Sequence, residues 1–349
     1  MTTERRALLG GKVNFPLCLA PMVGLSHVVL RMILRSYLPA GAVTLWPTEM
    51  LNSRKLPFED FARVPETYKG EGEGELVPQI LGNEAEPIGR SIARLTDWGA
   101  EGIDINMGCP VQKALRHNYG VALMGDPGYA SEVVAMARAQ TKLPVSVKLR
   151  AGSQGDFGFL ETFAKGLTKA GADWLTLHPR TPEQKRRGQA DWSQIRRLRD
   201  SLDVPVIGNG DIQITEDVHR MIQETGCDQV MAGRALAARP WMMWQLGEEL
   251  GFANPAGREG RAPRTREEEG AEYGRMLLQF LDLAPQYFTE EQALRKFRFF
   301  VRTTSVWLPF GMNLVSISTK ERTIADIRRE TARYFEQSIE MSARTELRQ

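Results

Sequence analysis

The sequence of 349 residues is poor in cysteine and has no long hydrophobic run. Its three cysteines, Cys18, Cys109 and Cys227, are too few and too scattered for a disulfide framework or a zinc site. No run of about 18 apolar residues could span a membrane. The N-terminal stretch MTTERRALLGGKVNFP also lacks the apolar core of a signal peptide. We therefore expect a protein of the reducing cytoplasm, with no metal and no membrane partner.

An excess of one charge is lacking as well. Lys and Arg number 45 against 43 Asp and Glu, which gives a net charge of +2. Such a balance neither suggests nor excludes nucleic acid as a partner. The apolar fraction of 42% and the charged fraction of 25% are ordinary for a soluble globular protein. The length suits one large domain with a smaller one.

What the sequence does contain is a repeated alternation of short apolar runs with longer amphipathic segments. Strands that are apolar on both faces and separated by helices indicate a parallel sheet. Eight such units within about 240 residues predict a closed (β/α)8 TIM barrel. A doubly wound open sheet is the alternative, but it usually has fewer strands and often a glycine-rich first turn. The expected strands are 15–20, 42–46, 77–81, 102–106, 144–148, 173–178, 204–209 and 228–233.

Polar or backbone-exposing residues come at the end of each expected strand. Because the carboxyl ends of barrel strands form the active-site face, these residues should gather at one mouth. We interpret this mouth as a ligand-binding site. Its expected members are Pro21, Met22, Thr48, Glu49, Gln79, Asn106, Cys109, Lys148, His178, Asn209, Gly210, Asp211, Gly233 and Arg234.

The stretches 208–212 and 232–236, after the seventh and eighth strands, favour a phosphate group. Their glycines let backbone N–H groups approach an anion, and Arg234 adds a cation. Tight turns would also explain the glycines, but barrels frequently bind phosphate at these two loops. A ring system above the barrel would meet Lys148, whose charge could stabilise a reduced flavin. It would also meet Gln79, Asn106 and His178.

Cys109 is the candidate for chemistry. A cysteine thiol has an unperturbed pKa of about 8.5, so it is mostly protonated at neutral pH and can donate a proton. Cys109 lies beyond a strand end in a Gly-Cys-Pro loop, whereas Cys18 and Cys227 fit small core residues. No histidine stands in a known nucleophile arrangement with Cys109, which favours acid catalysis over an attacking thiolate.

From about residue 249 the pattern changes to a stretch rich in Gly, Pro and charge, followed by helical periodicity. We predict a barrel domain over 1–248 and a linker with an all-α domain over 249–349. Basic residues in the second part alternate with phenylalanines, which could stack on exposed bases, although phenylalanine at this spacing is more often core. The candidate RNA contacts here are Arg295, Lys296, Arg298 and Arg302, among Phe297, Phe299 and Phe300.

Several motifs together resemble the tRNA-dihydrouridine synthases, which are flavin-dependent enzymes with an FMN-bearing barrel and a C-terminal helical domain. The motifs include QILGNE, IDINMGCPVQKALRHNYGVALMGDP, PVSVKLR, LTLHPRT, VPVIGNGDI and GCDQVMAGRALAARPWM. The resemblance implies reduction of the 5,6 double bond of uridine in RNA, most simply tRNA. NADPH or NADH would reduce the flavin, and Cys109 would donate the proton to uracil. The implied FMN contacts are Gln79, Asn106, Lys148, His178, Asn209, Gly233 and Arg234.

The sequence departs from the family pattern at Tyr119–Val121, Pro179 and Arg186. These changes leave undetermined which uridine and which RNA would be modified. Lys185, Arg186 and Arg187 could contact phosphates or form a solvated loop. The alternative functions are an FMN-dependent reductase of a free pyrimidine or other small molecule, and a non-catalytic RNA-binding protein. The helical domain argues against the first and the intact ligand-facing residues against the second. We expect a monomer.

Overall fold

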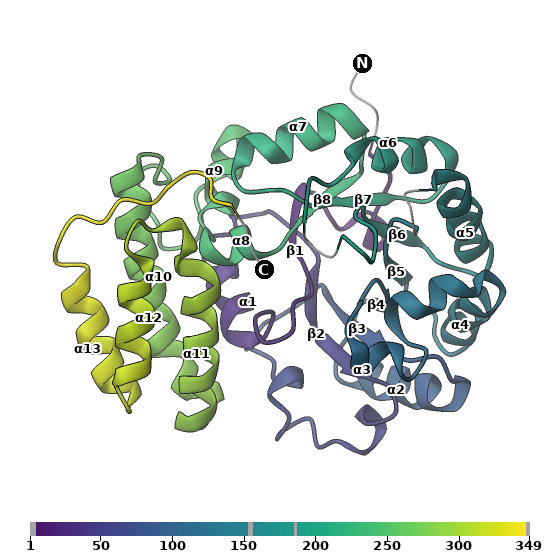
Figure 1. The fold of residues 1–349 in the computed structure, drawn as a ribbon, viewed down its shortest axis with the longest axis horizontal. Coiled ribbons are helices and arrows are strands. Elements are labelled where there is room, and N and C mark those ends of the chain that lie inside the picture. The colour runs from purple at the N-terminus through teal and green to yellow at the C-terminus, as the bar shows by residue number, and fades with distance from the viewer. Residues whose placement is uncertain (1–4, 153–155, 185–186, 347–349) are drawn as a thin grey trace.

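The computed structural model describes residues 5–152, 156–184 and 187–346. Its centre is an eight-stranded parallel sheet in the order β1-β8-β7-β6-β5-β4-β3-β2, which curls into a nearly closed barrel (Figure 1). The predicted (β/α)8 fold is therefore confirmed. The strands are β1 Leu17–Leu19, β2 Trp46–Asn52, β3 Leu76–Leu81, β4 Ile103–Met107, β5 Val145–Arg150, β6 Trp174–His178, β7 Val206–Asn209 and β8 Gln229–Ala232.

Helices surround the ring of strands (Figure 1). Aspartates fix where three of them begin, because the carboxylates of Asp126, Asp156 and Asp191 accept backbone N–H groups of the first turn. The helices of this part are α1 Val28–Arg35, α2 Ala85–Asp97, α3 Gln112–Leu115, α4 Pro127–Ala139, α5 Phe157–Lys169, α6 Trp192–Ser201, α7 Thr215–Thr225, α8 Arg234–Ala238 and α9 Met242–Glu249.

The second strand begins later than predicted. The expected run 42–46 overlaps β2 only at Trp46, so Thr48 and Glu49 lie inside the strand and not beyond it. The apolar pattern hides this strand because both polar side chains are buried and have partners in other segments. Thr48 Oγ1 accepts the N–H of Gln79, and Glu49 bonds Lys296. The fifth strand likewise extends to Arg150, two residues beyond its predicted end, and includes Lys148.

Four helices follow the barrel: α10 Arg266–Tyr287, α11 Glu290–Thr304, α12 Gly311–Lys320 and α13 Ile324–Tyr334. They pack beside one another next to α1 (Figure 1). The segment predicted as linker is already helical from Arg266, because Thr265 and Glu268 form a capping box there. The last described residues return to the barrel, where the Arg344 guanidinium lies 2.8 Å from the Asp217 carboxylate. Among the described residues, no helix is long and apolar enough to cross a membrane.

Candidate functional site

Gln79 in β3 and Asn106 in β4 connect the barrel wall to the loop that carries Cys109. Asn106 Nδ2 donates to Gln79 Oε1 at 2.7 Å. Asn106 Oδ1 accepts the backbone N–H groups of Gly108 at 3.1 Å and of Cys109 at 2.9 Å. Both amide side chains are buried. The next-to-last side chain of β4 therefore fixes the first turn of the cysteine loop.

Asp104 is a buried member of this network that the sequence analysis missed. Its carboxylate accepts Gln79 Nε2 and Ser146 Oγ, each at 2.6 Å. Burial raises the pKa of Asp104 above its usual value. The period of two in a strand gives the available signal, since Asp104 and Asn106 share one face while Ile103 and Ile105 share the other.

Lys148 places an amine at the same mouth. Its Nζ donates to Asn209 Oδ1 at 3.0 Å, and Asn209 Nδ2 donates to the carbonyl of Met231 at 2.7 Å. Burial and the positive charge of Arg150 lower the pKa of Lys148 to about 8. At neutral pH most of the chains therefore still carry an ammonium at this position.

His178, at the end of β6, is held neutral. Burial first, and then the nearby cations Lys148, Arg150, Arg180 and Arg234, keep its pKa well below the usual range. Arg180 Nη1 lies 3.2 Å from His178 Nε2. Because a guanidinium is only a donor, Nε2 accepts and Nδ1 carries the ring proton. His178 is therefore a neutral imidazole that can donate through Nδ1.

The carboxylate of Asp211 binds residues of the loop after β6. It accepts Arg180 Nη2 and the backbone N–H of Ala190, each at 2.6 Å. The predicted contact of Asp211 with a cofactor stays a prediction. Arg180 was also absent from the expected site, and two of its hydrogen bonds link Asp211 to His178.

The glycines after β7 and β8 are required by close packing. Gly210 has φ +122°, and a Cβ there would lie 2.8 Å from Ala190 and 3.1 Å from the His178 ring. A Cβ on Gly233 would lie 3.2 Å from the sulfur of Met22, in the loop after β1. Arg234 begins α8 directly after Gly233. Each of these glycines therefore leaves bare backbone close to a side chain from a neighbouring strand or loop.

Cys109 is half-buried, in a loop that Gly120 closes. The Cys109 carbonyl accepts the N–H of Val121, and a Cβ on Gly120 would lie 2.5 Å from that carbonyl oxygen. The other two cysteines, Cys18 and Cys227, are buried in the core, as predicted. Burial raises the pKa of Cys227 to about 11. Cys109 is thus the accessible thiol among the three.

The basic residues expected to contact RNA divide into two groups. Arg187, Arg295 and Arg302 are exposed. Lys296 is buried on the inner face of α11, with its Nζ 3.0 Å from Glu49 Oε1, so it is not available to a phosphate in this structure. Arg298 donates to the backbone carbonyls of Ser318 and Glu321 at the end of α12. Lys185 and Arg186 lie outside the described residues.

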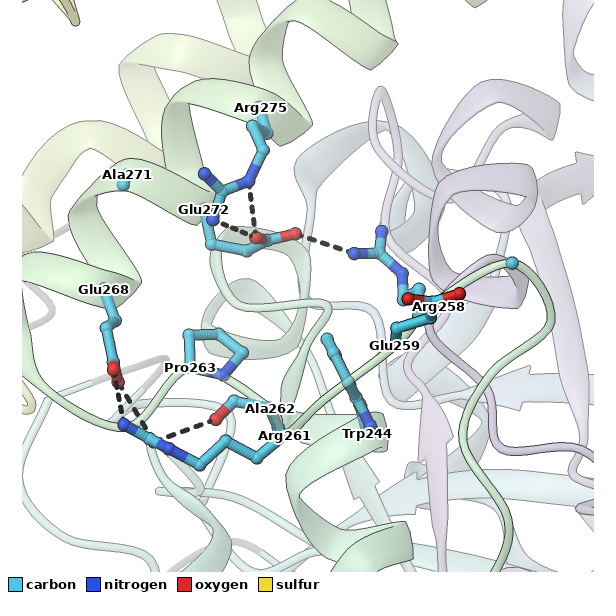
Figure 2. Close-up of a pocket in the computed structure, with 11 residues that line it drawn as sticks. Trp244, Arg258, Glu259, Arg261, Ala262, Pro263, Glu268, Ala271, Glu272 and Arg275 are labelled. Carbon is cyan, nitrogen blue, oxygen red and sulfur yellow. Dashed lines mark hydrogen bonds and ion pairs between the residues drawn. The ribbon is translucent and has the colours of Figure 1, made fainter.

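One cavity of about 530 Å³ lies away from the mouth, between α9, the following loop and α10 (Figure 2). Three arginines line it, and each is paired with a glutamate: Arg258 and Arg275 with Glu272, and Arg261 with Glu268. The three cations of the cavity wall are therefore paired within the wall, unlike the amine of Lys148.

Comparison with known proteins places the chain in a family. The family described as "Dihydrouridine synthase (Dus)" matches residues 18–299, which is most of the chain. A "Probable tRNA-dihydrouridine synthase" of Rhizobium leguminosarum bv. phaseoli is 34% identical over 262 residues, which cover 75% of this chain and 78% of the relative. The "tRNA-dihydrouridine synthase B" of Pseudomonas aeruginosa is 32% identical over 242 residues, which cover 67% of this chain and 69% of the relative. The chain therefore belongs to the dihydrouridine synthase family.

Proposed function

We propose that this chain reduces uridine in tRNA to dihydrouridine. The names of the relatives state this activity for those proteins. The observation in this chain that carries the proposal is the link through Asn106. One side chain contacts both Gln79 in the mouth and the backbone of Cys109, so the ligand-facing amides and the thiol are held in one unit.

The mouth fits a flavin, and we propose that the flavin is FMN. Among the described residues, the half-buried Lys148 ammonium has one hydrogen-bond acceptor, a neutral amide, although it can donate three bonds. A ligand with an electron-rich ring edge would supply the missing acceptors. Gly210, Gly233 and Arg234 would hold the phosphate, with Pro21 and Met22 beside it. The remaining ring contacts would be Gln79, Asn106, His178 and Asn209.

When bound, the flavin supplies a hydride for carbon 6 of the uracil. Cys109 supplies the proton for carbon 5, which completes the addition of two hydrogens across the double bond. Asn106 fixes the direction of this donation because it bonds the N–H groups of Gly108 and Cys109. Lys148 stabilises negative charge at the mouth. We propose NADPH or NADH as the source of electrons.

The RNA partner requires a surface beyond the mouth. We propose the division into a catalytic barrel over 1–248 and a linker with a helical RNA-binding domain over 249–349. Arg295 and Arg302 are the basic residues of the predicted set that the helical domain exposes, and Arg187 lies on the barrel side. Their phosphate contacts should weaken as salt rises. A tRNA substrate also favours a cytoplasmic protein.

The test is mass spectrometry of nucleosides from dihydrouridine-free tRNA treated with the protein, FMN and NADPH. We expect dihydrouridine to form. Cys109→Ala should keep its flavin and its NADPH oxidation but lose roughly 10²–10⁴-fold in dihydrouridine formation. Cys227→Ala is the matched control and should retain the activity, since Cys227 is a core residue. No product with intact protein would refute the proposal, and equal reduction of free uridine would favour the small-molecule reductase.

A further inference from the structure

One face of α11 exposes a stripe that alternates cations with an apolar ring. Arg295, Phe299 and Arg302 are spaced as i, i+4 and i+7, which places them in one row on the helix surface. Phe299 is 43% exposed, although large apolar side chains are usually covered. Phe297 and Phe300, by contrast, are buried in the core. The sequence alone does not separate Phe299 from these two.

The ring of Phe299 lies at the barrel mouth. A Cβ on Gly24 would come within 2.8 Å of that ring, so the phenylalanine packs directly on the loop that follows β1. Val23, the preceding residue of this loop, is 62% exposed. We call Val23 and Phe299 the mouth platform. It joins the catalytic barrel to the helical domain with an apolar surface that faces solvent.

A buried ion pair fixes the position of this platform. Lys296, one helical turn before Phe299, bonds Glu49 Oε1 at 3.0 Å, and Glu49 Oε2 accepts the N–H of Gly24 at 2.6 Å. One carboxylate therefore holds both the helix and the loop that form the platform. A surface fixed in advance loses little conformational entropy when a ligand binds to it.

The flanking charges identify the kind of ligand. Neither Arg295 nor Arg302 is paired with a carboxylate within the part of the chain that the structure describes. Two unpaired guanidiniums on either side of an exposed aromatic ring suit a single-stranded nucleic acid, which offers phosphates and flat bases at this spacing. An apolar protein partner would have no use for the two cations.

We propose that the mouth platform stacks on an RNA base next to the target uridine, while Arg295 and Arg302 hold the adjacent phosphates. The inference rests on the proposed function. A uridine that enters the barrel leaves its stack, and its neighbour loses a stacking partner. Phe299 replaces that partner at the rim, so it is a positioning residue that keeps the uridine extruded.

The experiment compares Phe299→Ala, Phe299→Trp and Phe310→Ala in the full-length protein with FMN, NADPH and unmodified tRNA. Phe310 is the matched control, because it is 72% exposed and belongs to the same helical domain. Phe299→Ala should lower kcat/KM for tRNA by roughly 10- to 100-fold, as expected for one lost base-stacking contact. Flavin reduction by NADPH should be unchanged, and Phe299→Trp should recover most of the loss because it keeps a ring.

The salt dependence of tRNA binding distinguishes the stacking contact of Phe299 from the phosphate contact of Arg302. Phe299→Ala should leave the slope of log Kd for tRNA against log salt unchanged, whereas Arg302→Ala should reduce it by about 0.7, the value for one phosphate contact with a single strand.

Three results would overturn the platform: normal tRNA kinetics of Phe299→Ala, an equal loss in Phe310→Ala, or no recovery with Phe299→Trp. Loss of self-association by Phe299→Ala with normal tRNA kinetics would make this face a contact between copies instead. If the unaltered protein forms no dihydrouridine, the result refutes the proposed function itself, on which the platform rests.

Discussion

Replacement of Lys296 by Met tests whether a buried ion pair joins the helical domain to the barrel. Lys296 and Glu49 are 6% and 2% exposed, and their charged atoms are 3.0 Å apart. The methionine keeps most of the side-chain volume but leaves the carboxylate with only the N–H of Gly24. An unpaired buried charge of this kind costs about 3–5 kcal/mol, a large part of the 5–15 kcal/mol typical of folded domains.

The assay is unfolding in urea, followed by tryptophan fluorescence and by circular dichroism. Two controls assign the loss to the buried charge. Arg295→Met removes an exposed cation one residue away and should change the free energy of unfolding by less than about 0.5 kcal/mol. The double variant Glu49→Gln with Lys296→Met removes both charges and keeps an acceptor for Gly24. It should recover most of the loss, since a buried pair replaced as a whole is often close to neutral.

Two outcomes would refute this reasoning. If Lys296→Met unfolds within about 1 kcal/mol of the unaltered protein, the carboxylate of Glu49 finds water or another partner, and the pair does not lock the two parts. If the double variant is as unstable as the single one, the loss comes from packing around the methionine and not from an unpaired charge.

Three further predictions concern the mouth. His178 has a pKa well below 6.5 when folded, so the unfolded chain binds a proton that the folded chain does not, and stability should fall as pH decreases below about 6.5. Burial lowers the pKa of His27 in the same way, so His178→Gln should reduce, but not abolish, the slope of the free energy of unfolding against pH in this range. Gly120→Ala places a Cβ 2.5 Å from the Cys109 carbonyl at φ +62°, so tRNA reduction should fall while FMN binding, measured by flavin fluorescence, persists; loss of both would mean that the loop supports the whole mouth. Arg234→Ala should weaken FMN retention on dialysis by removing the proposed phosphate cation, and unchanged retention would place the phosphate elsewhere.

The sequence by itself determined the barrel and grouped several polar residues at the ends of its strands. The alternation of apolar runs with amphipathic segments is local, and parallel strands send their carboxyl ends to one face. Gln79, Asn106 and Lys148 could therefore be grouped from their places in the chain alone. Their roles toward a cofactor stay predictions, because a strand end shows where a side chain lies and not what it binds.

Tertiary structure decided which polar residues are buried and which apolar ones are not. Glu49 and Lys296 are 247 positions apart, so no local pattern could show that each is the partner that permits burial of the other. For the same reason the apolar pattern did not predict β2, because its buried Glu49 resembles a loop residue when the sequence is read alone. The ring of Phe299 packs on the mouth loop at Gly24 and still stays partly exposed. That contact joins two segments that helical periodicity does not bring together.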